Sequence, residues 1–294
     1  MTDVAEARER YAEELRATAN VRSPAVVRAF ARVPREHFLG PGPWQILDPR
    51  ASLGFPPPYA LTPDASPVHL YRDVLVAIDA TRLLNNGQPS AQALWIDALD
   101  LRDGDHAVHI GCGTGYYTAI IAEVVGSSGR VTAIEMDGGL AERARTNLAH
   151  LPQARVIHGD GCLVDPGPAD AVYVNAGATH PLALWLESLS PGGRLLFPLV
   201  RWPWDASEGT ARGTGVVVKV TRRPQGHAAD VVSPVAIFPC PGAVESVADE
   251  RLRAAFGSGV AVNTVRSLRR EPHAQEPTCW LHGDGFCLST LPLT

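Results

Sequence analysis

The sequence lacks any long apolar run and any excess of basic residues. No stretch reaches the about 18 uninterrupted apolar residues that indicate a membrane-spanning helix. The formal net charge is −5, whereas domains whose main partner is a nucleic acid usually carry a basic face. The sequence therefore predicts neither a membrane protein nor a nucleic-acid-binding protein.

Cysteines are few and unpaired in sequence. Five occur in 294 residues, and no two of them form a Cys-x-x-Cys motif. We therefore expect neither a zinc site nor a disulfide framework, and we interpret the cysteines as small buried side chains in a reducing compartment. Residues 1–20 are acidic, have a helical pattern and lack the apolar core of a signal peptide, so a cytoplasmic location is expected.

Short apolar strands alternate with helical segments from residue 107 onward. The expected strands cover residues 107–110, 131–134, 154–157, 171–174 and 194–199. The expected helices between them cover residues 116–125, 138–149 and 181–189. This alternation implies right-handed crossovers, and therefore an α/β fold with a doubly wound, mostly parallel sheet that is Rossmann-like. Residues 215–221 and 231–238 resemble a closing antiparallel pair.

The segments outside this alternation have their own patterns. Residues 1–40 have helical periodicity, whereas residues 39–67 are rich in proline and glycine, which predicts irregular structure covering a site. Residues 201–215 are expected to form an exposed loop. We predict three parts, which are an N-terminal helical and proline-rich cap over residues 1–80, a ligand-binding core over residues 81–240, and a C-terminal extension over residues 241–294.

A glycine-rich loop follows the first expected strand, in the stretch VHIGCGTGYYTAIIAE from Val108 to Glu123. Its glycines have the spacing G-x-G-x-G, which lets the backbone turn tightly and approach a ligand. The dinucleotide fingerprint needs a glycine at position 116, where this chain has Tyr116. The spacing therefore favours S-adenosylmethionine (SAM) over NAD as the ligand.

Polar residues end the next three strands. Glu135 ends the second strand, where a carboxylate can accept hydrogen bonds from both ribose hydroxyls of an adenosine. Asp160 and Asn175 follow the third and fourth strands, and Asp160 is suited to the adenine amine. Each feature alone has a plainer explanation as a turn or a helix cap, but together they predict SAM binding. The cofactor-binding candidates are Asn86, Gly87, Gln92, Gly111, Cys112, Gly113, Thr114, Gly115, Glu135, Met136, Asp160, Gly161 and Asn175.

Several motifs between roughly residues 24 and 200 resemble those of protein-L-isoaspartate O-methyltransferases. They are VVRAFARVPREHF at 26–38, GQP at 87–89, the glycine loop, VTAIEMD at 131–137, HGDG at 158–161 and SPGGRLLFPL at 190–199. The resemblance implies a class I SAM-dependent methyltransferase fold, with residues 81–240 as its core. It also implies transfer of a methyl group to a carboxylate oxygen.

The chain departs from this family at three places, one of which is the loop after the fourth expected strand, where polar Asn175 and His180 stand in a segment that the family keeps rich in glycine and alanine. The family carries a Thr-x-Ser pattern before its Gln-Pro, where this chain has Asn85, Asn86 and Gly87, so that Gly87 replaces the signature serine. Ser90 stands further along and is not equivalent to it. The C-terminal third has no counterpart in the minimal repair enzyme, and members that act on ribosomally made peptides carry such extensions.

A carboxylate acceptor is ionised at neutral pH, so methyl transfer to it depends on positioning more than on a strong base. The catalytic candidates are therefore amide and hydroxyl side chains just before the glycine loop, with one histidine. They are Asn85, Asn86, Gln88, Ser90 and His180. A plain turn is the alternative for residues 85–87, a solvated helix face for Gln92, and a capping role for His180.

Arg72 and the pair His282 and Asp284 each have two interpretations. Arg72 could pair with a substrate carboxylate, although a structural ion pair is as good an explanation. His282 and Asp284 suggest metal ligands, but two residues without a third favour a tight turn, and no metal is predicted.

The leading hypothesis is a SAM-dependent carboxyl O-methyltransferase acting on a protein, peptide or small-molecule carboxylate. The alternatives are a natural-product or ribosomal-peptide tailoring methyltransferase with a different acceptor, and a SAM-binding module without turnover. The loss of the family serine favours the last of these. A nucleic-acid methyltransferase is disfavoured because residues 176–178 are Ala-Gly-Ala and lack the Asn/Asp-Pro-Pro-aromatic motif.

Overall fold

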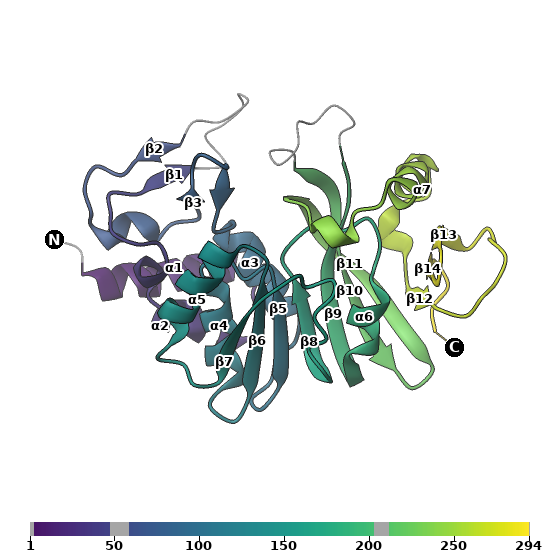
Figure 1. The fold of residues 1–294 in the computed structure, drawn as a ribbon, viewed down its shortest axis with the longest axis horizontal. Coiled ribbons are helices and arrows are strands. Elements are labelled where there is room, and N and C mark those ends of the chain that lie inside the picture. The colour runs from purple at the N-terminus through teal and green to yellow at the C-terminus, as the bar shows by residue number, and fades with distance from the viewer. Residues whose placement is uncertain (1–2, 48–58, 203–211, 294) are drawn as a thin grey trace. The chain divides into compact units, whose positions relative to one another are not determined.

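The computed structural model describes residues 3–47, 59–202 and 212–293. The chain forms two compact units, and each is described by itself. Unit 1 comprises the residues up to Asp105 together with Cys112–His158, and unit 2 comprises His106–Gly111 together with the residues from Gly159 onward. Figure 1 shows the course of the ribbon and its helices and strands. The division into three parts at residues 80 and 240 stays a prediction.

Unit 1 begins with the expected helices, α1 (Val4–Thr18) and α2 (Pro24–Arg32). The side chain of Ser23 accepts a hydrogen bond from the Val26 N–H, and Pro24 takes the first helical position, where its missing N–H costs nothing. The helix ends at Arg32 because Val33 precedes a proline, which disfavours helical backbone. Two short 3-10 helices follow, η1 (Arg35–Phe38) and η2 (Pro67–Leu70).

The proline-rich segment is partly regular, and the expectation of irregular structure is wrong for two stretches. These are β1 (Gln45–Leu47) and β2 (Ala60–Leu61), which join β3 (Leu75–Asp79) and β4 (Leu84–Asn85) in a sheet of order β2-β1-β3-β4. Residues 48–58 of that segment lie outside the described residues.

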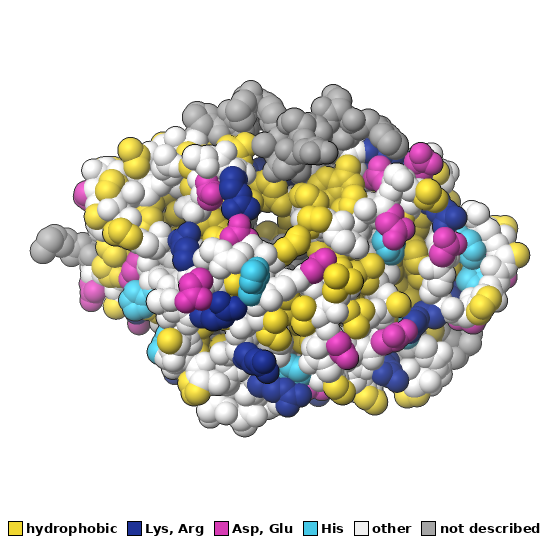
Figure 2. Space-filling model, in the orientation of Figure 1, with side chains coloured by type: hydrophobic (Ala, Val, Ile, Leu, Met, Phe, Trp, Pro, Cys, Tyr) yellow, Lys and Arg dark blue, Asp and Glu magenta, His cyan; other side chains and the backbone are white. Residues whose placement is uncertain are grey.

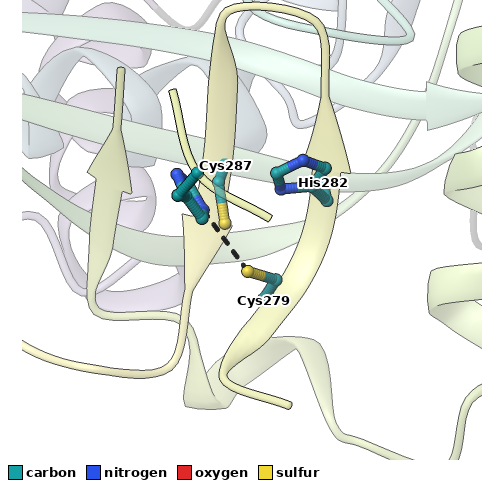
Figure 3. Close-up of side chains that lie close together, drawn as sticks. Cys279, His282 and Cys287 are labelled. Atoms are coloured by element: carbon teal, nitrogen blue, oxygen red, sulfur yellow. Dashed lines mark hydrogen bonds between the residues drawn. The ribbon is translucent and has the colours of Figure 1, made fainter. Parts of the chain in front are cut away.

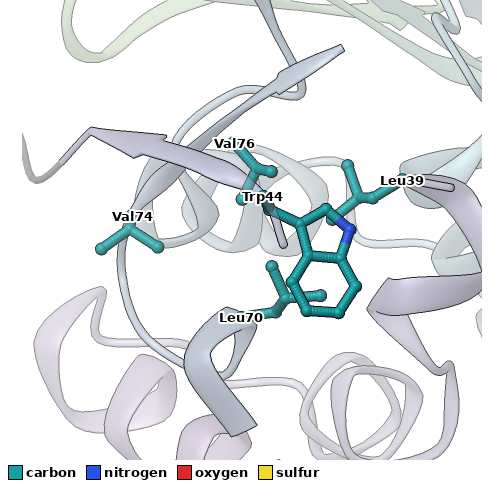
Figure 4. Packing of buried hydrophobic residues seen from close by; sticks show 5 residues of the cluster. All are labelled: Leu39, Trp44, Leu70, Val74 and Val76. Carbon is teal, nitrogen blue, oxygen red and sulfur yellow. The ribbon is translucent and has the colours of Figure 1, made fainter. Parts of the chain in front are cut away.

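A buried apolar cluster explains why these short strands form despite the prolines around them. It consists of Leu39, Trp44, Leu70, Val74 and Val76, which lie close together in Figure 4. These residues come from sequence positions far apart, so local composition carried no sign of the packing that stabilises the strands.

The rest of unit 1 follows the predicted alternation. Its elements are α3 (Pro89–Ala98), α4 (Tyr116–Val125), β6 (Arg130–Glu135), α5 (Gly138–Leu148) and β7 (Ala154–His158). The strands β6 and β7 pair in parallel, with Ile134 opposite Ile157. Helix α4 is buried on nearly every side, which accounts for its almost wholly apolar sequence.

Unit 2 contains the other parallel strands of the alternation. They are β5 (His106–Ile110), β8 (Ala169–Val174) and β9 (Leu189–Arg201), with the short helix α6 (Ala183–Glu187) before β9. β8 pairs in parallel with both β5 and β9, and its central Val172 is fully buried, as expected for a strand covered on both faces. The parallel pairs and the intervening helices confirm the α/β fold.

Antiparallel strands extend the sheet of unit 2. β10 (Gly213–Arg223) and β11 (Gly226–Ile237) form the expected closing pair. Residues 203–211 of the expected exposed loop lie outside the described residues.

The C-terminal extension adds further strands to this sheet, which the sequence did not predict. Its elements are η3 (Pro241–Ala243), α7 (Ser246–Gly257), η4 (Val262–Thr264), β12 (Ser267–Arg269), β13 (Cys279–Gly283) and β14 (Phe286–Ser289). β12 pairs with β11, and the hairpin β13–β14 pairs with β12 through β14. Throughout the described ranges, every helix is too short or too polar to cross a membrane.

Candidate active site

The glycine loop leads directly into α4. Gly113 and Gly115 have φ values of +57° and +95°, a region that side-chain-bearing residues rarely adopt. A Cβ at Gly115 would lie 2.9 Å from the Leu148 side chain of α5, so only glycine lets the loop pass this close. The N-cap residue of α4 is Gly115, which has no side chain to accept from the N–H groups of the first turn, so these groups suit a negatively charged ligand group.

Glu135 lies against this loop. Its Oε2 accepts a 2.7 Å hydrogen bond from the Gly113 N–H, and its Oε1 accepts a 3.0 Å hydrogen bond from the Asp137 N–H. Burial raises the pKa of this carboxyl group, while the two N–H donors act in the opposite direction. Each carboxylate oxygen has a second lone pair, so Glu135 is held in place and can still accept from a ligand hydroxyl.

The loop between β3 and β4 is tied to the residues after Glu135. Arg82 donates a 2.6 Å hydrogen bond to Asp137, which also caps α5 by accepting from the Leu140 N–H. Arg143 of α5 donates to the Ile78 carbonyl oxygen. Met136, which precedes Asp137 in the chain, is 44% exposed, so its side chain is available to cover an apolar ligand surface.

The segment from Asn85 to Gln92 contains most of the catalytic candidates. The Asn85 Oδ1 accepts from the Gly87 N–H, which closes the turn expected for Asn-Asn-Gly, and the Asn85 amide donates to the Tyr59 hydroxyl. The Tyr117 hydroxyl donates a 3.2 Å hydrogen bond to the Gly87 carbonyl oxygen. This bond fixes the segment to α4, within a turn of the glycine loop.

Asn86 has one satisfied end and one unsatisfied end. Its Oδ1 accepts hydrogen bonds from the Val76 N–H at 3.2 Å and from the Arg35 guanidinium at 3.1 Å. Its Nδ2 is buried and has no hydrogen-bond partner within the part of the chain that the structure describes. Because a buried donor without a partner costs free energy, this NH₂ group fits a ligand acceptor.

Arg35 organises this segment, and sequence reasoning missed it. The side chain is fully buried, and its guanidinium donates to the carbonyl oxygens of Leu70, Arg72 and Val74 as well as to Asn86. A guanidinium has five donors in a rigid fork, so one side chain can hold two stretches of backbone. The sequence signal for this role was the arginine inside VPREHF, at residues 33–38.

The side chains of Gln88 and Ser90 both donate hydrogen bonds to one carboxylate. Asp73 accepts from the Ser90 N–H at 2.9 Å, from the Ser90 hydroxyl at 2.8 Å and from the Gln88 amide at 3.1 Å. Asp73 therefore caps α3 in place of Gln88, whose side chain makes no cap bond. The structure gives both side chains a positioning contact, and their catalytic role stays a prediction.

Arg72, which the sequence offered as a partner for a substrate carboxylate, is exposed.

Unit 2 holds the remaining cofactor candidates. A Cβ at Gly111 would lie 3.3 Å from the Asn175 carbonyl oxygen, and the Asn175 N–H donates to the Ile110 carbonyl oxygen. The Asp160 Oδ1 accepts a 2.8 Å hydrogen bond from the Cys162 N–H, which fixes the turn after β7. Gly161 must be glycine, because a Cβ there would come within 2.3 Å of Ile110.

His180 lies among residues of unit 2 near the end of β11. Its Nδ1 is 3.1 Å from the Thr179 hydroxyl, which itself donates to the Ala243 carbonyl oxygen. We therefore assign the proton to Nδ1, which leaves Nε2 facing Glu245 at 3.6 Å. Burial lowers the pKa of His180, against an opposing effect of Glu245, so the ring is neutral at pH 7.

Solved structures share this fold. A protein-L-isoaspartate O-methyltransferase superposes with a TM-score of 0.60 at 23% identity, covering 79% of this chain and 65% of that one. A second one, from Plasmodium falciparum and in complex with S-adenosyl-L-homocysteine, superposes with a TM-score of 0.56 at 17% identity, covering 79% of this chain and 97% of that one. These two likenesses show that the chain shares the methyltransferase fold.

The sequence gives the family. Residues 61–206 match the family described as protein-L-isoaspartate(D-aspartate) O-methyltransferase. Protein-L-isoaspartate O-methyltransferase 2 of Archaeoglobus fulgidus is 34% identical over 207 residues, which cover 68% of this chain and 83% of the relative. The chain belongs to the protein-L-isoaspartate O-methyltransferase family. The resemblance of the motifs, the predicted cofactor and the predicted enzyme class are thus confirmed.

Proposed function

We propose that this enzyme methylates the carboxylate of an isoaspartyl residue in proteins or peptides. Membership of the family supports this acceptor. The observation that carries the proposal is the buried NH₂ group of Asn86, which has no hydrogen-bond partner among the described residues. An ionised carboxylate needs donors that hold it and needs no base to deprotonate it.

The donor would be held by groups that suit its parts. When bound, SAM supplies a methyl group that its positively charged sulfur has already activated. Glu135 is suited to the two ribose hydroxyls, because its oxygens are fixed by N–H donors and keep free lone pairs. In the same unit, Gly113 has a φ of +57° and lets the backbone approach the ligand without a side chain in the way.

On the acceptor side, Asn86 is the group we favour. Its buried Nδ2 lacks a partner among the described residues, and Arg35 and the Val76 N–H fix the orientation of its amide. An amide NH₂ fixed in this way can donate to a carboxylate oxygen without losing rotamer freedom at the time of reaction. Asn85 would act more remotely, by closing the turn that presents Asn86 and Gly87.

A test of His180 distinguishes a carboxylate acceptor from a hydroxyl or amine acceptor. A hydroxyl or amine acceptor must lose a proton, and the neutral His180 could take it at Nε2. A carboxylate acceptor makes this group dispensable. We therefore expect His180→Asn to change the rate of methyl transfer by no more than a few fold, and a loss of 100-fold or more would favour a hydroxyl or amine acceptor.

The test is a transfer assay with methyl-labelled SAM on an isoaspartyl peptide and on its aspartyl twin. We expect label on the isoaspartyl peptide only, released at alkaline pH as expected of an ester. Label on both peptides would indicate that the enzyme accepts another carboxylate. Label that resists base would indicate that the methyl group goes to an atom other than a carboxylate oxygen. No label on either peptide, with SAM bound in calorimetry, would point to a different acceptor or to binding without turnover. A cytoplasmic site of action is part of the same proposal.

A further inference from the structure

We propose that the C-terminal extension holds a structural zinc ion, bound by His273, Cys279, His282 and Cys287. One ligand atom from each of these side chains lies within 4.8 Å of every other. Figure 3 shows Cys279 and His282 of β13 close to Cys287 of β14. This inference is independent of the methyl acceptor, since all four residues lie beyond residue 206, where the family match ends.

The set has the chemistry that zinc prefers. Two thiolates and two imidazoles form a Cys₂His₂ site, and two thiolates balance the charge of Zn²⁺. Bond lengths of about 2.3 Å to sulfur and about 2.0 Å to nitrogen, at a tetrahedral angle, place sulfur and nitrogen about 3.5 Å apart. The Cys279 sulfur lies 3.5 Å from the His273 Nε2. Four protein ligands leave no open position, which is typical of a structural site.

A β-bulge brings three of the ligands to one face. In a regular strand, Cys279 and His282 would point to opposite faces, because side chains alternate. The register of β13 against β14 shifts by one residue between Cys279 and Leu281, and the extra residue returns His282 to the face of Cys279. Cys287 stands directly opposite His282 on β14, and residues opposite each other share a face.

The fourth ligand is brought in by a braced loop. Arg269 of β12 donates to Glu271 at 2.9 Å and to Glu276 at 3.0 Å, so the two ends of the loop that carries His273 are attached to one guanidinium. The His273 Nδ1 lies 2.8 Å from the Glu271 carbonyl oxygen, to which it can donate, leaving Nε2 to face the sulfur. Metal-binding histidines are usually oriented by such an outer bond.

Two details fit an ion at this place. The buried Nδ1 of His282 has no hydrogen-bond partner within the described ranges, which leaves a buried acceptor for a metal. The Glu276 N–H points at the Cys279 sulfur at 3.3 Å, a contact that favours the thiolate. Cys279 and His282 also line a cavity of about 620 Å³, through which an ion could arrive.

Asp284 is excluded from the ligand set. Its side chain is 98% exposed and lies 3.4 Å from Arg251. It therefore provides a matched control, because it lies in the turn between the two strands that carry three of the proposed ligands. His273 provides a second test of the site. It lies on the loop between β12 and β13, so we expect a substitution there to leave the strands intact.

The metal content of the reduced full-length chain tests the proposal, by elemental mass spectrometry after purification without chelators. We expect one zinc per chain in the natural protein and in Asp284→Asn, and loss of the ion in Cys279→Ser and Cys287→Ser. We expect His273→Gln to stay folded and to bind zinc at least about 10-fold more weakly in a competition titration. Substitution by Co²⁺ should give a thiolate charge-transfer band that the same variants lose.

Three results would overturn the site. The first is a natural protein that takes up no zinc when it is reduced and supplied with the ion. The second is zinc bound equally by His273→Gln and both cysteine variants. The third is a Cys279–Cys287 disulfide in protein isolated from cells without reductant. If a cysteine variant does not fold, the zinc content of the natural protein and the His273→Gln titration still decide.

Discussion

The Gln92 side chain lies directly beneath Gly87. A Cβ at position 87 would stand 2.9 Å from the Gln92 Nε2, and Gly87 has a φ of +81°. Gln92 is itself buried at 2% exposure, so it has little room to move away. The glycine that replaces the family serine therefore suits both the left-handed backbone at position 87 and the close approach of Gln92.

We expect Gly87→Ser to destabilise the protein by about 1–2 kcal/mol and to leave methyl transfer unimproved. The left-handed backbone and the contact with Gln92 both oppose a side chain. Gly40→Ala is the matched control, because Gly40 has a φ of +73° and open space around it, so it reports the backbone cost alone. Urea denaturation of both variants measures the difference. A Gly87→Ser enzyme that is both stable and more active would show that the serine fits after all.

Glu135→Gln should weaken SAM binding by about 10- to 100-fold. The change removes the negative charge and puts an NH₂ group against one of the two N–H groups that Glu135 accepts from, so two charge-assisted hydrogen bonds are weakened. Isothermal calorimetry with SAM gives the dissociation constant. Glu123→Gln serves as the control, because Glu123 pairs with Arg32 and should leave the constant unchanged. Equal affinities in the two variants would remove Glu135 from the donor site.

Arg35→Met should lower the free energy of unfolding by about 3 kcal/mol. Methionine fills the space but leaves the buried carbonyl oxygens of Leu70 and Val74 without a donor, at about 1–3 kcal/mol for each. Arg35→Lys should recover part of the loss, since an ammonium group can serve some of these acceptors. Arg32→Met is the control, because that side chain is 67% exposed. A stable Arg35→Met enzyme with an unchanged KM would show that Asn86 needs no such support.

His109 should make the fold sensitive to acid. It is fully buried in β5 with its ring stacked 4.9 Å from that of Tyr173, and burial lowers its pKa to about 3, from an ordinary value of 6.5. Between these pH values His109 is protonated in the unfolded chain and neutral in the folded chain. The free energy of unfolding therefore falls as the pH drops below 6.5, by up to about 1.4 kcal/mol per pH unit from this group.

Denaturation at several pH values between 7 and 4 tests this effect. His109→Gln should be less stable at pH 7, because it loses the stacking, but its stability should fall less steeply toward acid. His150→Gln, at an exposed position, should keep the slope of the natural protein. Equal slopes in all three proteins would show that the His109 ring accepts a proton inside the fold.

The sequence predicted what local patterns determine. Apolar alternation and the glycine spacing identified the strands from β5 to β9 and the loop before α4, because each pattern repeats within a few residues. It could not predict the role of Arg35, whose acceptors lie 35 to 51 residues further along the chain. It also missed the His273–Cys287 cluster, because a one-residue bulge decides which side chains of β13 share a face.

The chain passes from one compact unit to the other at residues 105/106, 111/112 and 158/159. Each unit is therefore assembled from two separate pieces of sequence, and a single cut of the gene cannot deliver either one whole. A fragment ending at His158 would carry β5 without β8, the strand with which it pairs in unit 2. Genetic fusions and split reporters made from this enzyme should therefore keep the chain intact from Asp105 through Gly159.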